Sequence, residues 1–373
     1  MEYKVRFVNP QRQYADHKDE YLNTVNDIFT RGKLINQEDL KKFEENVARF
    51  VGTKYAVGVN SGTSAIYLAL KAAGIGEGDE VLTVAHTFIA TFSCVYVTGA
   101  KPILLDVGRD FNMDAKQIEK AITPKTKAIE PVHLNGRLAD MEMIMDIAKR
   151  KGLIVIEDAA QALGATMTMK DGTQKMAGSF GLAGCFSLYP FKALGAFGNG
   201  GVLTTDDPEI AKKVSLLRWN GENREDRDFY YHSLNMLLDN VQAALLNVKL
   251  NYFPAWVERR RAIAMRYHEG LKEVKQVITP HFEDPRFRDS YQNYAIRAER
   301  RDELKEFFDK EGVETLISWA TPMYKTRAML PNDIFLPETE KICKEVISLP
   351  MYPELTDEEV DYVIAATRKF YQQ

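Results

Sequence analysis

The chain has 373 residues, of which 45% are hydrophobic and 27% are charged, and its formal net charge is −4. This is the composition of a soluble globular enzyme, without the excess of positive charge that nucleic acid attracts. No apolar run approaches the roughly 20 residues that a membrane span requires, so we expect no membrane partner. The first residues, MEYKVRFVNPQRQY, lack the apolar core of a secretion signal, and a cytoplasmic location is the default expectation.

The chain has three cysteines, Cys94, Cys185 and Cys343. They are widely spaced and odd in number, so they outline neither a disulfide framework nor a zinc site. We expect them to be buried small apolar residues and expect no metal.

The first 50 residues are predicted to be mainly helical, because Leu40, Phe43, Val47 and Phe50 recur at helical spacing. The chain then alternates short strands and helices. Such alternation predicts a mostly parallel sheet with helices on both faces. The expected strands are YAVGV, EVLTV, PILLD, AIEPV and LIVIE, and the expected helices begin near Thr63, Phe88, Asp114 and Ala139.

A polar, aromatic stretch, ENREDRDFYYHSLNM, predicts an ordered loop. A long helix should begin near Asp239, and Pro254 should end or kink it. The remainder is predicted to be α/β, with SYQNYAIRA and SLPMYP as strands, RRDELKEFFDKEG as a helix and a closing helix capped by Thr356. We expect a large domain over residues 1–245 and a small C-terminal domain over residues 246–373.

Lys192 is the candidate covalent centre. It follows the apolar strand AGCFSL and precedes the small residues ALGAFGNGG. At a strand end facing a cleft, loss of water lowers the pKa of a lysine and frees its lone pair for imine chemistry. A lysine considered alone is more often an exposed loop residue, so the residues around it must decide.

Two upstream segments decide in favour of chemistry. Asp158 ends the strand LIVIE, and residues at the carboxyl ends of such strands face the ligand crevice of an open α/β sheet. YAVGVN runs through a tight turn into the helix SGTSAIYLAL, whose free N–H groups and dipole suit a phosphate. A phosphate site, a carboxylate for a ring nitrogen and an imine-forming lysine together describe pyridoxal phosphate.

The sequence resembles the DegT/DnrJ/EryC1/StrS family, fold-type I enzymes that mostly transaminate ketone groups on nucleotide-linked sugars. Seven strings carry the resemblance in the family's order: GKLINQEDLKKFEENVARFVG, SGTSA, GDEVLTVAHTFIAT, PVHLNGR, EDAAQALGA, the lysine segment and SLPMYPELTDEEV. The resemblance implies the pyridoxal-phosphate-dependent transferase fold of type I: a mostly parallel central sheet with helices on both faces and a smaller C-terminal α/β domain.

The resemblance also assigns roles around the cofactor ring. Lys192 would form the imine and then carry the proton between the substrate and cofactor carbon C4′. Asp158 would keep the pyridine nitrogen protonated, Gln161 would reach the phenolic oxygen and Phe88 would stack on the ring.

The phosphate of the cofactor, in its pyridoxal or pyridoxamine form, would be bound by the N–H groups of Gly62 and Thr63. The hydroxyls of Thr63 and Ser187 would add to this site. Asn235 resembles the asparagine that reaches the phosphate from the neighbouring subunit, which implies a homodimer with shared active sites.

Three positions depart from the family pattern. Leu237 stands where relatives commonly have arginine, and HLNGR replaces the frequent HLYGQ, so Asn135 and Arg137 reflect either a different substrate or a different subunit contact. We expect His133 to be a structural hydrogen-bonding residue, and we assign no role to His86.

Tyr189 carries the expectation about the substrate. A Tyr-Pro pair at this place resembles relatives that aminate C3 of a keto-sugar, and the tyrosine would contact the sugar. The expected reaction moves an amino group from glutamate to a nucleotide-linked 3-keto-6-deoxy sugar. The alternatives are a C4 aminotransferase, a sugar dehydratase, which in this family has histidine in place of Lys192, and a non-catalytic regulator. A nicotinamide enzyme is excluded because no GxGxxG follows an early strand.

Overall fold

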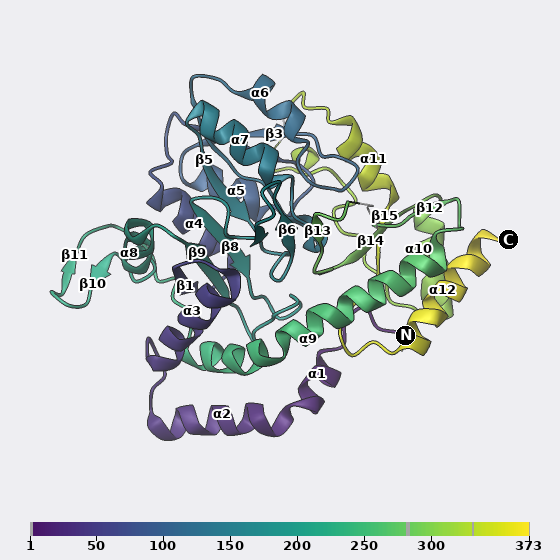
Figure 1. The fold of residues 1–373 in the computed structure, drawn as a ribbon, viewed down its shortest axis with the longest axis horizontal. Coiled ribbons are helices and arrows are strands. Elements are labelled where there is room, and N and C mark those ends of the chain that lie inside the picture. Colours follow the sequence, from purple (N-terminus) through teal and green to yellow (C-terminus); the bar gives the residue numbers. More distant parts are fainter. Residues whose placement is uncertain (1–2, 281–283, 330–331, 373) are drawn as a thin grey trace.

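The computed structural model describes residues 3–280, 284–329 and 332–372. A seven-stranded sheet of order β1-β9-β8-β5-β4-β2-β3 forms its centre (Figure 1). All its pairings are parallel except those of β9, which runs antiparallel to β1 and β8. The predicted mostly parallel sheet is confirmed. Its strands are β1 (Tyr55–Val59), β2 (Glu80–Val84), β3 (Lys101–Leu105), β4 (Thr126–Ile129), β5 (Ile154–Asp158), β8 (Ala183–Ser187) and β9 (Gly201–Thr205).

Helices cover both faces of this sheet, because both faces are apolar. Side chains alternate along a strand, and neighbouring residues of β5 accordingly join different cores: Val155 joins one apolar cluster and Ile156 the other. The Ile156 cluster contains residues of α4 (Gly62–Ala72), α5 (Ala90–Val97) and α8 (Pro208–Leu217). The Val155 cluster contains residues of α3 (Glu38–Val51), α7 (Met141–Lys151) and α9 (Asn240–Leu271).

The N-terminal region is helical, as predicted. It consists of α1 (Pro10–Asp16), α2 (Lys18–Arg31) and α3, in which Leu40, Phe43 and Val47 are buried. The short α6 (Ile118–Ala121) follows a 3₁₀ turn over Ala115–Gln117. The polar, aromatic stretch contains a hairpin of β10 (Glu222–Asn223) and β11 (Asp228–Phe229).

The C-terminal part forms a second α/β layer around a third apolar cluster. Its sheet has the order β12-β14-β15 and is antiparallel, with α10 and α12 packed on it. Val5 joins this cluster and bridges to Val313, so the start of the chain packs with its end. The elements are β12 (Val277–Ile278), β14 (Tyr294–Ala298), α10 (Arg301–Glu311), α11 (Pro337–Glu345), β15 (Val346–Leu349) and α12 (Asp357–Tyr371).

A small sheet joins the two parts. Strand β13 (Phe287–Arg288) pairs with β6 (Thr166–Thr168), which pairs with β7 (Gln174–Met176). Residues that follow β13 are thereby held near the segment that carries Lys192, since Gln292 hydrogen-bonds to Phe191 and Ala193.

Pro254 was expected to end or kink the long helix, and it does not end it, since α9 continues to Leu271. A proline inside a helix removes one hydrogen bond and costs about 3 kcal/mol. Its neighbours Phe253, Trp256 and Val257 are buried, and burial of each such side chain stabilises by about 1.5–3 kcal/mol, which offsets that cost. The predicted domain boundary at 245/246 lies within α9 and stays a prediction.

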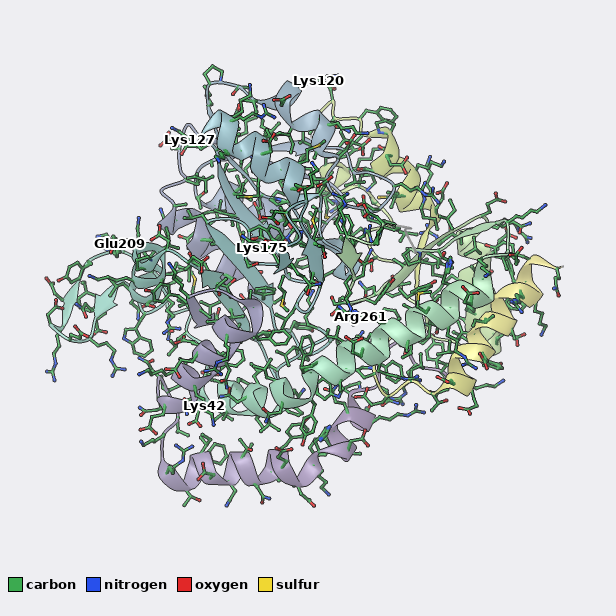
Figure 2. All side chains as sticks on the ribbon, in the orientation of Figure 1. Lys42, Lys120, Lys127, Lys175, Glu209 and Arg261 are labelled. Atoms are coloured by element: carbon green, nitrogen blue, oxygen red, sulfur yellow. The ribbon has the colours of Figure 1, made fainter. Side chains whose placement is uncertain are left out.

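Charged side chains lie mainly on the outside of the molecule. Lys42, Lys120, Lys127, Lys175 and Glu209 are exposed (Figure 2). Among the described residues no helix has both the length and the apolarity needed to cross a bilayer.

Candidate active site

The carboxyl ends of β5 and β8 bring the predicted site residues together. Asp158 is the last residue of β5 and Ser187 the last of β8, and these strands are neighbours in the sheet. Lys192 follows five residues after Ser187, and the charge of Asp158 acts on its amino group. These groups lie at one edge of the sheet, as the sequence pattern of a strand followed by a polar residue predicts.

Lys192 differs from the surface lysines of Figure 2 in its surroundings. Burial lowers its pKa to about 8, and the opposite charge of Asp158 limits the decrease. A lysine with this pKa is neutral far more often near pH 7 than an ordinary lysine, and a nucleophilic amine must be neutral.

The side-chain amide of Gln292 holds the backbone on both sides of Lys192. Its Nε2 donates to the carbonyl of Phe191 at 3.0 Å, and its Oε1 accepts from the N–H of Ala193 at 2.6 Å. Gln292 is only 8% exposed. Sequence reasoning missed this residue, because it lies about 100 positions away and no local pattern marks it.

Asp158 is a buried carboxylate with two hydrogen-bond donors. Thr91 Oγ1 donates to its Oδ2 at 2.8 Å, and the N–H of Ala160 donates to its Oδ1 at 3.1 Å. Burial raises the pKa of Asp158, while these two hydrogen bonds and the charge of Lys192 limit the increase. Thr91 was also missed, although it lies three residues after Phe88 in the string HTFIAT.

The turn between β1 and α4 fits a phosphate group. The first N–H groups of a helix have no partners within the helix. Ser61 Oγ accepts a hydrogen bond from the N–H of Ser64, so the N–H groups of Gly62 and Thr63 are available to a ligand. A Cβ on Gly62 would lie 2.8 Å from Ser187 Cβ, so this close approach of the turn to β8 requires glycine.

Two aromatic rings near this edge are open to a ligand. Phe88 follows β2 and is 60% exposed, and its carbonyl accepts a hydrogen bond from the N–H of Thr91 at 3.2 Å. Tyr189 is 48% exposed, and its carbonyl accepts from the N–H of Lys192 at 2.8 Å. The free amine, the carboxylate, the phosphate turn and an uncovered ring together fit pyridoxal phosphate.

The match to known families agrees with this geometry. Residues 15–368 match the model of the DegT/DnrJ/EryC1/StrS aminotransferase family. The chain belongs to this family.

Members of the family resemble the chain over its full length. It is 40% identical to a "Pleiotropic regulatory protein" of Geobacillus stearothermophilus, covering 99% of both chains. It is 37% identical to a dTDP-3-amino-3,4,6-trideoxy-alpha-D-glucose transaminase of Streptomyces venezuelae, covering 99% of this chain and 97% of that one. The crystal structure of S. venezuelae DesV in complex with a ketimine intermediate matches with a TM-score of 0.95 and 36% identity, over 100% of both chains. The fold is therefore that of the family's aminotransferases.

The departures at Asn135 and Arg137 have partners within the chain. Arg137 pairs with Asp289 at 3.0 Å, and Asn135 Oδ1 accepts from Asn293 Nδ2 at 3.1 Å. The N–H of Asn135 also donates to Gln161 Oε1 at 2.8 Å, which orients that amide. These two residues join the HLNGR segment to the C-terminal part of the chain.

Asn235 and Leu237 both pair within the same chain, Asn235 through a bridge with Trp219. Leu237 forms a bridge with Val59 and is buried, so a core leucine occupies the place of the family's common arginine. Asn235 is exposed, and its Oδ1 accepts from the N–H of Leu237 at 3.4 Å. Its reach to a second subunit stays a prediction.

His133 has the hydrogen-bonding position that was expected for it. Its Nδ1 accepts from the N–H of Ala139 at 3.2 Å, so its Nε2 carries the proton and donates to Glu157 at 2.9 Å. His86 is buried, and burial lowers its pKa to about 4.

The three cysteines are free and buried, as predicted. In the described ranges no group of histidine, cysteine or acidic residues is arranged to hold a metal ion.

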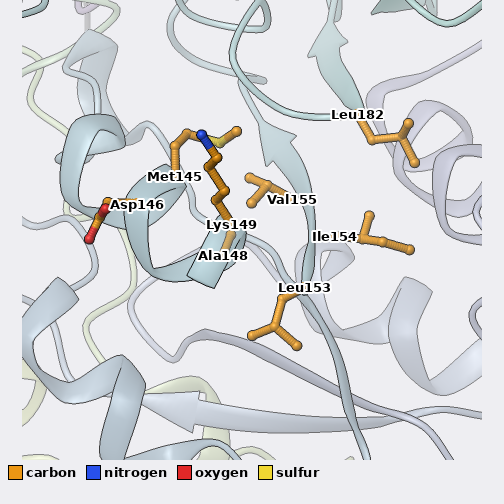
Figure 3. Close-up of a pocket in the computed structure, with 8 residues that line it drawn as sticks. All are labelled: Met145, Asp146, Ala148, Lys149, Leu153, Ile154, Val155 and Leu182. Carbon is orange, nitrogen blue, oxygen red and sulfur yellow. The ribbon is translucent and has the colours of Figure 1, made fainter. Parts of the chain in front are cut away.

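A surface pocket of about 570 Å³ lies at the amino-terminal ends of β5 and β8 (Figure 3). Leu153 and Ile154 at the start of β5 line it, together with Leu182 just before β8 and Lys149 on α7. It is mostly apolar and separate from the site above.

Proposed function

We propose that this aminotransferase moves an amino group from glutamate to C3 of a nucleotide-linked 3-keto-6-deoxy sugar, with pyridoxal phosphate as the carrier, as in deoxyamino-sugar biosynthesis. The observation that carries the proposal is a lysine with a pKa of about 8 beside a buried aspartate at the ends of adjacent strands. When bound, the cofactor would supply an electron sink for the substrate carbon that loses a proton.

Lys192 and Asp158 would divide the proton chemistry between them. The neutral Nζ of Lys192 would accept the proton from the substrate carbon of the amino donor and return it to cofactor carbon C4′. Asp158 would hold a proton on the ring nitrogen, and the hydrogen bonds from Thr91 and Ala160 would stabilise its negative charge.

The other site residues would hold the cofactor in place. The N–H groups of Gly62 and Thr63, with the hydroxyls of Thr63 and Ser187, would bind the phosphate. Phe88 would stack on the ring. Gln161 already accepts from Asn135 with its oxygen, which leaves its amide NH₂ to donate to the phenolic oxygen.

Preference for C3 rests on relatives and on Tyr189. Relatives from Streptomyces venezuelae and Aneurinibacillus thermoaerophilus, 37% and 35% identical, are named as transaminases that form dTDP-linked 3-amino sugars. The phenol of Tyr189 would hydrogen-bond the sugar and turn C3 towards the carrier.

We also propose a homodimer with shared sites. The support is the position of Asn235: it is exposed, and it follows the protruding hairpin of β10 and β11 (Figure 1). Such a side chain is available to the phosphate turn of a second copy.

A regulatory role without catalysis is the alternative that the Geobacillus relative's name suggests. The lowered pKa of Lys192 and the paired donors on Asp158 favour catalysis, because a binding protein needs neither. A dehydratase is disfavoured because lysine, not histidine, stands at position 192.

The test is to supply the purified protein with pyridoxal phosphate, glutamate and matched 3-keto and 4-keto sugar nucleotides, and to locate the new amine by NMR. The proposal expects an amine at C3 from the 3-keto substrate. An amine formed only at C4 would refute the regiochemistry, and absence of any amine with either sugar would refute the proposed substrate and donor.

A further inference from the structure

Glu130 is a buried carboxyl group that the proposed reaction does not use. It directly follows β4, its side chain is 0% exposed, and neither carboxyl oxygen has a hydrogen-bond partner among the described residues. Only its backbone is paired: its N–H donates to the Leu82 carbonyl at 2.8 Å, and its own carbonyl accepts from Thr83 Oγ1 at 2.9 Å.

Glu130 shares one face of the sheet with Asp158. Residues two apart on a strand face the same side, so Glu130 faces with Ala128 and Asp158 with Ile156, and both partners belong to the same apolar cluster. Cys185 of β8 and Cys94 of α5 belong to that cluster too. The charge of Glu130 would act on Asp158 and on these two thiols.

Glu157 shows how this fold supplies hydrogen-bond donors to a buried carboxyl group. It lies on the neighbouring strand and is also 0% exposed. Its oxygens accept hydrogen bonds from four donors: the N–H groups of Gly178 at 2.7 Å, Phe180 at 2.7 Å and Gly181 at 2.8 Å, and His133 Nε2 at 2.9 Å. Glu130 has no such set of donors.

A carboxylate in an apolar layer loses its hydration, and without hydrogen-bond donors nothing replaces the lost stabilisation of its charge. The group therefore takes up a proton. The negative charge of Asp158 acts in the same direction. Both causes, with burial the larger, raise the pKa of Glu130 well above its usual value.

We propose that Glu130 is a neutral carboxylic acid in the folded protein, so that the Glu130–Asp158 pair carries one negative charge, located on Asp158. Glu130 thus acts through Asp158. A second negative charge in this layer would increase the proton affinity of Asp158, and a protonated Asp158 could not hold the proton of a ring nitrogen.

The inference rests on the packing of the chain and not on the sugar or the amino donor. It can therefore be tested in protein freed of cofactor, where its failure is separate from that of the proposed function.

The first test compares folding equilibria of wild type and Glu130→Gln by denaturant unfolding from pH 5 to pH 8. Free glutamate has a pKa of about 4.3, so Glu130 is ionised in the unfolded chain across this pH range, whereas it stays protonated in the folded protein. Wild type must then take up a proton to fold and loses stability as pH rises, whereas the variant does not.

The expected ratio of the folding constants, variant over wild type, increases about tenfold per pH unit until Glu130 ionises in the folded state. Glu306→Gln is the matched control, because Glu306 is exposed on α10, and its ratio should stay constant. A constant ratio for Glu130→Gln would overturn the proposal. If that variant does not fold, Glu130→Leu gives the same comparison.

The second test locates the proton directly. Infrared spectra at neutral pH should contain a protonated-carboxyl band that persists in Asp158→Asn and disappears in Glu130→Gln. A band that disappears in Asp158→Asn instead would overturn the proposal, because the proton would then lie on Asp158.

Discussion

The lowered pKa of Lys192 predicts a reactivity that no surface lysine shares. With a pKa of about 8 instead of 10.5, about one Lys192 in eleven is neutral at pH 7, against about one in three thousand for an ordinary lysine. At pH 7 Lys192 should therefore react with a small aldehyde about 300-fold faster than it would with the pKa of an ordinary lysine.

The assay treats cofactor-free protein with the aldehyde and borohydride and quantifies the modified Lys192 peptide by mass spectrometry. The rate at Lys192 should increase tenfold per pH unit up to about pH 8 and then become constant. In Asp158→Asn the bend should move to lower pH, because the negative charge that raises the pKa of Lys192 is gone. Lys249 is the internal control for the effect of access. Burial also lowers its pKa to about 8, but it is 4% exposed and donates to the Gly195 carbonyl.

A rate at Lys192 that continues to increase tenfold per unit to pH 10 would refute the reasoning. Lys192 would then titrate like an exposed lysine.

Three further variants test the site. Asp158→Asn should keep the fold and reduce turnover by about 10² or more, and near-normal turnover would reduce Asp158 to a structural acid. Gln292→Met should lower the free energy of unfolding by about 2 kcal/mol, about 1 kcal/mol for each lost hydrogen bond, and should decrease kcat more than it raises KM; an unchanged kcat would contradict the role of Gln292 in holding Lys192. Mixing inactive Lys192→Ala with Asn235→Ala chains should restore activity, because a heterodimer has one site with both residues. No recovery after demonstrated subunit exchange would show that Asn235 does not act across the interface.

Local pattern made part of the site predictable. Asp158 and Ser187 end strands, and a strand end can be read from a few consecutive residues. The hydrophobic alternation likewise gave the sheet with helices on both faces, because that periodicity reflects burial directly.

Long-range contacts made the rest unpredictable. Thr91 and Asp158 are 67 positions apart, and Gln292 and Phe191 are 101 apart, so no local string indicates these hydrogen bonds. Glu130 lies in the strand-like string AIEPV, whose burial on both faces appears only when helices cover both faces of the sheet. Pro254 does not end α9 for a related reason, since tertiary packing of this helix offsets the local cost of proline.

The most direct test of the central claim is the first half of the reaction. Protein loaded with pyridoxal phosphate is mixed with glutamate alone, while its visible absorption and the released 2-oxoglutarate are measured. We expect the absorption of the lysine-bound carrier to be lost as one equivalent of 2-oxoglutarate appears per subunit, with no product from Lys192→Ala. Unchanged absorption and no 2-oxoglutarate in the wild type would contradict glutamate-dependent amino transfer through Lys192.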